Sequence, residues 1–162
     1  MAHYVKLKRN PLRYRRKLPH LQLSDWYFVT FTTDERWELT PEARTAVFAS
    51  CMHEHERTIR IDAVVVMPEH AHMLFHLHSE TGAEPLLYEI LGAIKGASAH
   101  KVNKLLGRSG RVWVAESFDR MVREGEHLRY RNYIIMNPVR RGLVSSPDDY
   151  EWLWYEKNQE KT

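Results

Sequence analysis

The chain has 162 residues, of which 43% are hydrophobic and 11% aromatic, and a formal net charge of +3. This composition is typical of one soluble globular domain with its own core and excludes a disordered chain. A single cysteine, Cys51, excludes an internal disulfide and suits a reducing compartment, and no apolar run approaches the roughly 18 residues of a membrane span.

Residues 1–24 form a basic arm that contains seven Lys or Arg and no Asp or Glu. The arm also lacks the apolar segment of a signal peptide, so we expect a cytoplasmic protein. Basic side chains gather in two further groups, within residues 95–111 and 120–141, so the charge is unevenly distributed along the chain. Such segregation predicts a nucleic-acid binder, whereas the alternative is a set of ordinary solvated faces and a solvated tail. The candidate DNA-binding residues are Arg13, Arg15, Arg16, Lys17, Lys95, Lys101, Lys104, Arg123, Arg140 and Arg141.

The arm is followed by three elements. Residues 26–33 are rich in aromatic and β-branched side chains and predict a strand. Thr40 followed by Pro41 predicts an N-cap and the start of a helix that runs to about Arg57, with Cys51 as a small core residue. Residues 59–67 predict a second strand, and its apolar 63–67 run indicates burial.

The next segment, residues 70–78, predicts a strand with histidines on one face and apolar residues on the other. Residues 84–106 have the longest helical periodicity, and Gly107 is expected to end that helix. Residues 112–114 and 118–123 predict short strands, and 126–136 predict a last helix. This order predicts an α+β fold, with an antiparallel sheet that carries two helices on one face.

Two histidines mark the third predicted strand. His70 and His72 flank Ala71, so their side chains share one face of the strand. Neighbouring imidazoles on a rigid strand can hold a divalent metal. The alternative is a solvated pair on an open sheet face. His76 and His78 have the same parity and are interpreted as solvated or DNA-facing.

The last predicted helix carries a second motif. Tyr133 and Asn137 are four residues apart, so they lie on the same helix face. Each has a simpler interpretation: Tyr133 as a half-buried aromatic, and Asn137 as the N-cap of a turn over residues 138–141. Pro138 is expected to push Asn137 out of helical geometry.

Together, these two motifs resemble the single-tyrosine HUH transposases, the insertion-sequence-200-like group that includes the REP-associated tyrosine transposases. The middle residue is small here (Ala71), and Asp25-Trp26-Tyr27-Phe28 replaces the Gly-Thr-Tyr-type start of the first strand that is common in the REP-associated branch. The resemblance implies a ferredoxin-like fold over residues 25–155, followed by a polar tail over 156–162. It further implies that the last helix carries the nucleophile Tyr133, and that His70, His72 and Asn137 bind a metal.

The implied reaction is metal-dependent nicking and joining of single-stranded or hairpin DNA through a 5′-phosphotyrosine. Two nitrogen ligands and an amide oxygen favour Mg²⁺ or Mn²⁺ as the cofactor. Two rivals stay open: a nucleic-acid-binding module without catalysis, and a metal-dependent hydrolase in which Tyr133 is structural. The sequence also leaves open whether the protein is a monomer or homodimer, and whether Tyr133 meets the histidines of its own chain or of another.

Overall fold

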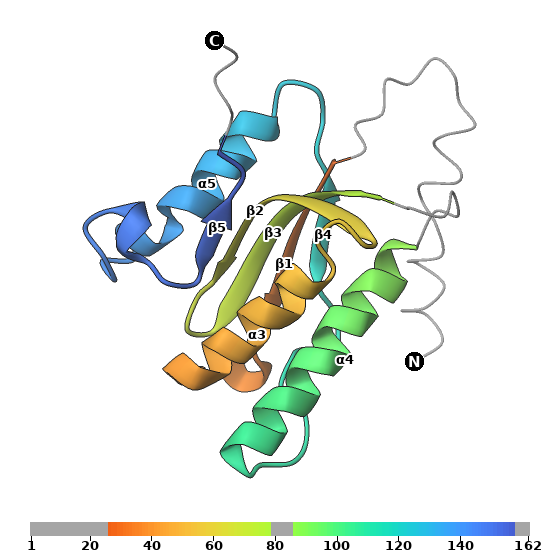
Figure 1. Cartoon of the computed structure of the whole chain (residues 1–162), viewed down its shortest axis with the longest axis vertical. Helices are drawn as coiled ribbons and strands as arrows, with labels where there is room; N and C mark the ends of the chain where they lie inside the picture. The colour runs from red at the N-terminus through yellow and green to blue at the C-terminus, as the bar shows by residue number, and fades with distance from the viewer. Residues whose placement is uncertain (1–25, 79–85, 158–162) are drawn as a thin grey trace.

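The computed structural model describes residues 26–78 and 86–157, which form an α+β fold (Figure 1). Five strands make one antiparallel sheet in the order β4-β1-β3-β2-β5. The strands are β1 (Trp26–Thr32), β2 (Ile59–Val66), β3 (His70–Leu77), β4 (Phe118–Met121) and β5 (Leu153–Tyr155). The first four have the strand order of a ferredoxin-like sheet, which confirms the predicted fold class. The basic arm at 1–24 lies outside the described residues.

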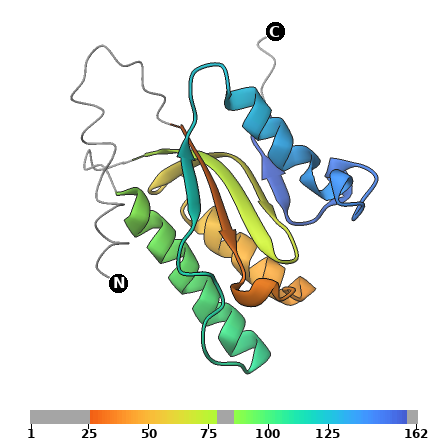
Figure 2. The same cartoon turned by 180° about the vertical axis from the view of Figure 1, so that it is seen from behind.

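Three helices cover the two faces of this sheet. They are α3 (Pro41–His53), α4 (Leu87–Leu106) and α5 (His127–Arg140), and two short 3-10 turns follow β1 and precede β5. Figures 1 and 2 show α3 and α4 on one side of the sheet and α5 on the other. None of the helices in the described residues is long and apolar enough to span a membrane.

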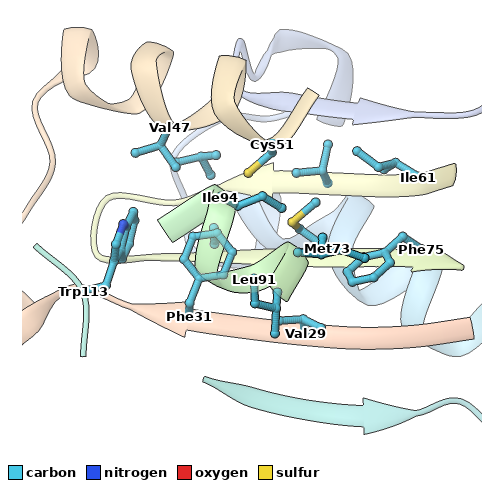
Figure 3. Close-up of a cluster of buried hydrophobic side chains, with 14 of the residues drawn as sticks. Val29, Phe31, Val47, Cys51, Ile61, Met73, Phe75, Leu91, Ile94 and Trp113 are labelled. Atoms are coloured by element: carbon cyan, nitrogen blue, oxygen red, sulfur yellow. The ribbon is translucent and has the colours of Figure 1, made fainter. Parts of the chain in front are cut away.

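The main core lies between the sheet and the pair α3 and α4 (Figure 3). Alternate residues of each strand point into it because successive side chains of a strand face opposite ways. Val29 and Phe31 come from β1, and Met73 and Phe75 come from β3; all four are fully buried. Cys51 is also buried there, as expected, and burial raises the pKa of its thiol to about 12.

Local signals set the helix ends. The Thr40 side chain accepts a hydrogen bond from the Ala43 backbone at 3.2 Å, and Pro41 occupies the first helical position of α3. Gly107 ends α4 in the left-handed conformation, with φ of 59°, which glycine adopts without a steric cost. Both signals confirm the sequence predictions, although α3 stops at His53 and not near Arg57.

One predicted strand does not form, one helix is longer than predicted, and one strand was missed. Residues 112–114 form no strand; only Trp113 makes an isolated bridge, to Thr33. Helix α5 was predicted to end at Met136 but continues through Pro138 to Arg140. Strand β5 was not predicted, and it pairs with β2 at the edge of the sheet.

A β-bulge in β2 shapes the face under α5. The register on β3 shifts between Ile61 and Ala63, so Asp62 is an extra residue. Its carboxylate accepts from His127 Nε2 at 2.8 Å and pairs with Arg131 Nε at 3.1 Å. Both partners lie on α5, so the bulge ties the start of that helix to the sheet.

Candidate active site

The two histidines of β3 lie side by side beneath α5. Their ring centroids are 4.5 Å apart, which confirms that they share one face. The alternative interpretation, a solvated pair on an open face, was wrong, because His70 and His72 are only 9% and 5% exposed. A second apolar cluster, which includes Phe28, Leu74 and Ile134, covers this side of the sheet. The histidine pair is therefore built into a packed layer.

His72 is held by its Nδ1 atom. That atom lies 2.7 Å from the Thr30 hydroxyl on β1, and Phe28 stacks on the imidazole with ring centroids 5.4 Å apart. Burial, and then the charges of His70 and Arg140, lower the pKa of His72 from 6.5 to about 3, so the ring stays neutral. Within the described residues, His72 Nε2 is buried and has no hydrogen-bond partner. A neutral ring that donates from Nδ1 keeps a lone pair on this nitrogen.

His70 is held in the same way by a carboxylate. Its Nδ1 lies 3.1 Å from Glu69 Oε1, and Arg141 donates to the same oxygen at 2.7 Å. Burial lowers the pKa of His70, which the neighbouring Glu69 charge only partly offsets. Burial raises the pKa of Glu69, but the Arg141 hydrogen bond and the nearby positive charges bring it below its usual value. An ionised Glu69 thus orients the His70 ring and leaves Nε2 as the ring nitrogen outside this hydrogen bond.

Tyr133 projects from α5 over the histidine pair. Its ring centroid lies 5.2 Å from that of His72, and the side chain is 40% exposed. The Arg140 guanidinium sits over the tyrosine ring at 4.4 Å and also donates to the Tyr133 carbonyl at 2.7 Å. A nucleophile must reach both its substrate and the activating groups, and this half-buried position allows both.

Asn137 lies one turn further along α5 and points into the buried layer. It stays within the helix, contrary to the expectation that Pro138 would displace it, and its carbonyl accepts from the Arg141 backbone at 3.0 Å. Pro138 removes only one backbone donor, close to the end of the helix, where the loss is tolerated. The Asn137 side chain is 6% exposed overall, and its Oδ1 has no partner among the described residues.

Two buried atoms without a partner among the described residues, His72 Nε2 and Asn137 Oδ1, test whether a metal fits here. A buried nitrogen and a buried amide oxygen without partners are costly unless something binds them, and both are metal-ligand atoms. Across residues 26–78 and 86–157, no three His, Cys, Asp or Glu side chains gather as a metal site. A metal site here would have two histidines and a neutral amide as its protein ligands, a set that fits a labile divalent cation.

The structure separates the predicted basic residues. Lys95, Lys101 and Lys104 lie on α4, across the sheet from Tyr133, and Lys95 donates to the Val114 carbonyl at 2.8 Å. Arg140 and Arg141 lie at the end of α5 beside the histidines, and Arg123 follows β4. The α4 lysines therefore lie on a different side of the sheet from the candidate site. The candidates Arg13, Arg15, Arg16 and Lys17 lie outside the described residues.

Sequence reasoning missed Thr30, Glu69 and the pocket beside Tyr133. Thr30 pairs with His72 across the β1 and β3 ladder, and this register is not encoded in either strand alone. Glu69 precedes His70, so a carboxylate next to a candidate ligand was an available signal. The pocket has a volume of about 770 Å³ and aromatic walls that come from three elements.

No protein-family model matches the chain, and no curated protein sequence matches it. Among solved structures, a REP-associated tyrosine transposase bound to a REP hairpin aligns with a TM-score of 0.58 and 23% identity, over 79% of this chain and 74% of that one. The chain has the fold of that transposase. A structure from Deinococcus radiodurans R1, described as that of a transposase, aligns with a TM-score of 0.47 and 18% identity, over 72% and 92%. At that score the second alignment supports no conclusion.

Proposed function

We propose that this protein is a transposase-like enzyme of the single-tyrosine HUH type, which nicks and joins single-stranded DNA. One observation carries the proposal: His72 Nε2 and Asn137 Oδ1 are buried without partners among the described residues, and the Tyr133 ring lies 5.2 Å from the His72 ring. The likeness to a transposase bound to a DNA hairpin supports hairpin-forming DNA as the partner.

In the proposed reaction, Tyr133 is the nucleophile. A phenol ordinarily has a pKa of about 10 and attacks only after its proton is lost, here to solvent at the exposed side of the ring. The phenolic oxygen forms a bond to phosphorus, and the bond from phosphorus to the 3′ oxygen breaks. The leaving strand takes a proton and ends in a 3′-hydroxyl, while the other strand stays on Tyr133 through its 5′ phosphate. One phosphodiester replaces another, so attack by a new 3′-hydroxyl reverses the step without ATP.

His70, His72 and Asn137 would hold Mg²⁺ or Mn²⁺. When bound, this cation supplies Lewis-acid polarisation of the scissile phosphate. The protein prepares the two imidazoles for it, because Thr30 and Glu69 occupy both Nδ1 atoms and leave Nε2 for the ligand role. Such outer partners also fix the ring orientations before substrate arrives.

Arg140 and Arg141 have distinct parts in this proposal. Arg141 holds Glu69, so it acts on His70 through that carboxylate. Arg140 lies exposed over the Tyr133 ring, where its charge can attract a phosphate. An arginine fork suits phosphate oxygens because it offers paired donors in one plane.

A covalent adduct distinguishes this reaction from its rivals. The protein is incubated with end-labelled single strands that carry a hairpin and with Mn²⁺, then run on a denaturing gel. We expect an adduct that resists SDS, is absent from Tyr133→Phe and persists in Tyr130→Phe, the control one helical turn earlier. A hydrolase would release product without an adduct, and a binding module would leave the DNA intact; either result contradicts the proposal.

A further inference from the structure

Several aromatic side chains besides Tyr133 line the pocket next to it, and the proposed attack on phosphate does not use them. Its apolar lining comes from Phe28, Phe118, Tyr130, Tyr133 and Met136, and its volume is about 770 Å³. Cavities of several hundred Å³ with apolar walls and a few polar groups are typical of small-molecule and base-binding sites. The pocket also contains His72, so it is continuous with the candidate active site.

Phe118 is the side chain that most needs an explanation. It is 59% exposed, although it lies on a sheet strand and points toward the side that α5 covers. Tyr133 and Met136, also exposed, line the same pocket, and a group of exposed apolar side chains gathered in one place marks a binding surface. Phe28, 6% exposed, forms the floor, with ring centroids 6.4 Å from Phe118 and 4.7 Å from Tyr130.

The sheet register fixes how far Phe118 lies from the histidines. Phe118 pairs with Thr30, and Thr30 pairs with His72, so the three residues form one row across β4, β1 and β3. Two strand spacings separate the ends of the row, which is about 10 Å. A base attached to a phosphate at Tyr133 can reach that far within one nucleotide.

The charge around the pocket also favours a nucleotide. Arg129 and Arg140 line it together with the amide of Asn132. The guanidinium groups suit the phosphates on either side of a base, and an Asn amide can pair with two edge atoms of adenine, as an arginine can with guanine. An aromatic platform with basic rims is the usual arrangement for an unpaired base.

We propose that this pocket binds one unstacked purine base of the DNA strand, directly next to the phosphate at Tyr133, with Phe118 as the stacking platform. The inference rests on the proposed function for the identity of the strand and extends it to a base-specific subsite. It explains why an edge strand exposes a phenylalanine at this position, and it predicts that purine preference depends on a residue far from the metal ligands.

The test uses single nucleotides, which require no cleavage. Isotope-labelled protein is titrated in NMR experiments with each of the four deoxynucleoside 5′-monophosphates and with deoxyribose 5-phosphate. We expect saturable shifts of the Phe118 and Tyr130 ring signals with dAMP and dGMP, weaker binding of dTMP and dCMP, and no ring shifts with the sugar phosphate. Equal shifts with the sugar phosphate, or no purine preference, would overturn the proposal.

Three variants locate the stacking surface. Phe118→Ala should weaken purine binding about tenfold or more, as expected for the loss of one stacked ring. Phe118→Tyr retains the ring and should bind as the wild type does. Leu105→Ala removes a comparably exposed side chain, 53%, from α4 on the other side of the sheet and should change nothing. Unchanged purine affinity in Phe118→Ala contradicts the proposal, and circular dichroism checks that each variant is folded.

The adduct assay separates the two proposals. Adduct formation without purine binding would overturn the base pocket and leave the enzyme assignment intact. Purine binding that depends on Phe118, without any adduct, would support the pocket and overturn the nicking reaction.

Discussion

Asp62 on β2 and Arg131 on α5 form a largely buried ion pair of 3.1 Å, which fastens the helix that carries Tyr133 to the sheet that carries the histidines. Side chains of both residues are less than 15% exposed. Removing one member of such a pair leaves an uncompensated charge in a poorly solvated place.

Asp62→Ala should therefore lower the free energy of unfolding by about 2–4 kcal/mol and misplace Tyr133. Urea denaturation measures the first effect and adduct yield at saturating DNA the second. Glu126→Gln is the control, because its pair with Arg120 at 3.2 Å is more exposed and should contribute less than about 1 kcal/mol. Equal destabilisation by both changes would contradict the anchoring role of Asp62.

The proposed metal ligands predict a stability effect that needs no DNA. A cation that binds only the folded protein raises its melting temperature, by an amount that grows with cation concentration. Mn²⁺ should stabilise the wild type, whereas His70→Ala, His72→Ala and Asn137→Ala should show little or no such rise in thermal melts. His76→Ala, a half-buried histidine on the same face of β3, should respond as the wild type does. A normal response in His72→Ala and Asn137→Ala would refute the ligand set.

The lowered pKa of His72 gives stability a defined pH dependence in the absence of metal. The folded state holds the ring neutral down to about pH 3, whereas the unfolded state protonates near pH 6.5. Between these values the unfolded state binds the extra proton, so stability falls as the pH falls. The slope attributable to His72 is about 1.4 kcal/mol per pH unit. Denaturation in EDTA across this pH range should show that the free energy of unfolding falls less steeply with falling pH for His72→Gln than for the wild type. Equal slopes for the two proteins would contradict the buried neutral ring.

The placement of the basic residues predicts which of them engage DNA near the site. Arg140→Ala should weaken single-strand binding and flatten the dependence of log affinity on log salt by about 0.7, as expected for one lost phosphate contact. Lys104 is the matched control, because it is exposed on α4, across the sheet from Tyr133. Salt-titrated fluorescence anisotropy compares the two alanine variants, and an equal effect of both would place DNA on the α4 side as well.

Much of this arrangement follows from simple periodicity. Alternation along residues 70–77 placed His70 and His72 together, and a spacing of four placed Tyr133 above Asn137. These relations are local, since they depend only on the geometry of one strand or one helix. That is why the shared face of the histidines and the helix that carries Tyr133 could be predicted before their packing was known.

The parts that could not be predicted depend on contacts between distant segments. Thr30 reaches His72 only through the strand register, and Asp62 meets α5 only because a bulge turns it toward that face. A solvated histidine pair was a reasonable alternative because His is polar, but Phe28 stacks on the His72 ring, and the apolar cluster that includes Phe28 and Ile134 covers this side of the sheet. Strand β5 is too short, at three residues, for alternation to reveal it.

The contact of Tyr133 with His72 occurs within a single chain, which has a consequence for mixtures of copies. A site built as proposed from the intrachain contact would be complete in each chain, and an inactive copy would then neither inhibit nor restore its neighbours. A chain with a damaged tyrosine and one with damaged histidines would stay inactive when combined. Activity in a mixed population should therefore fall in simple proportion to the share of intact chains.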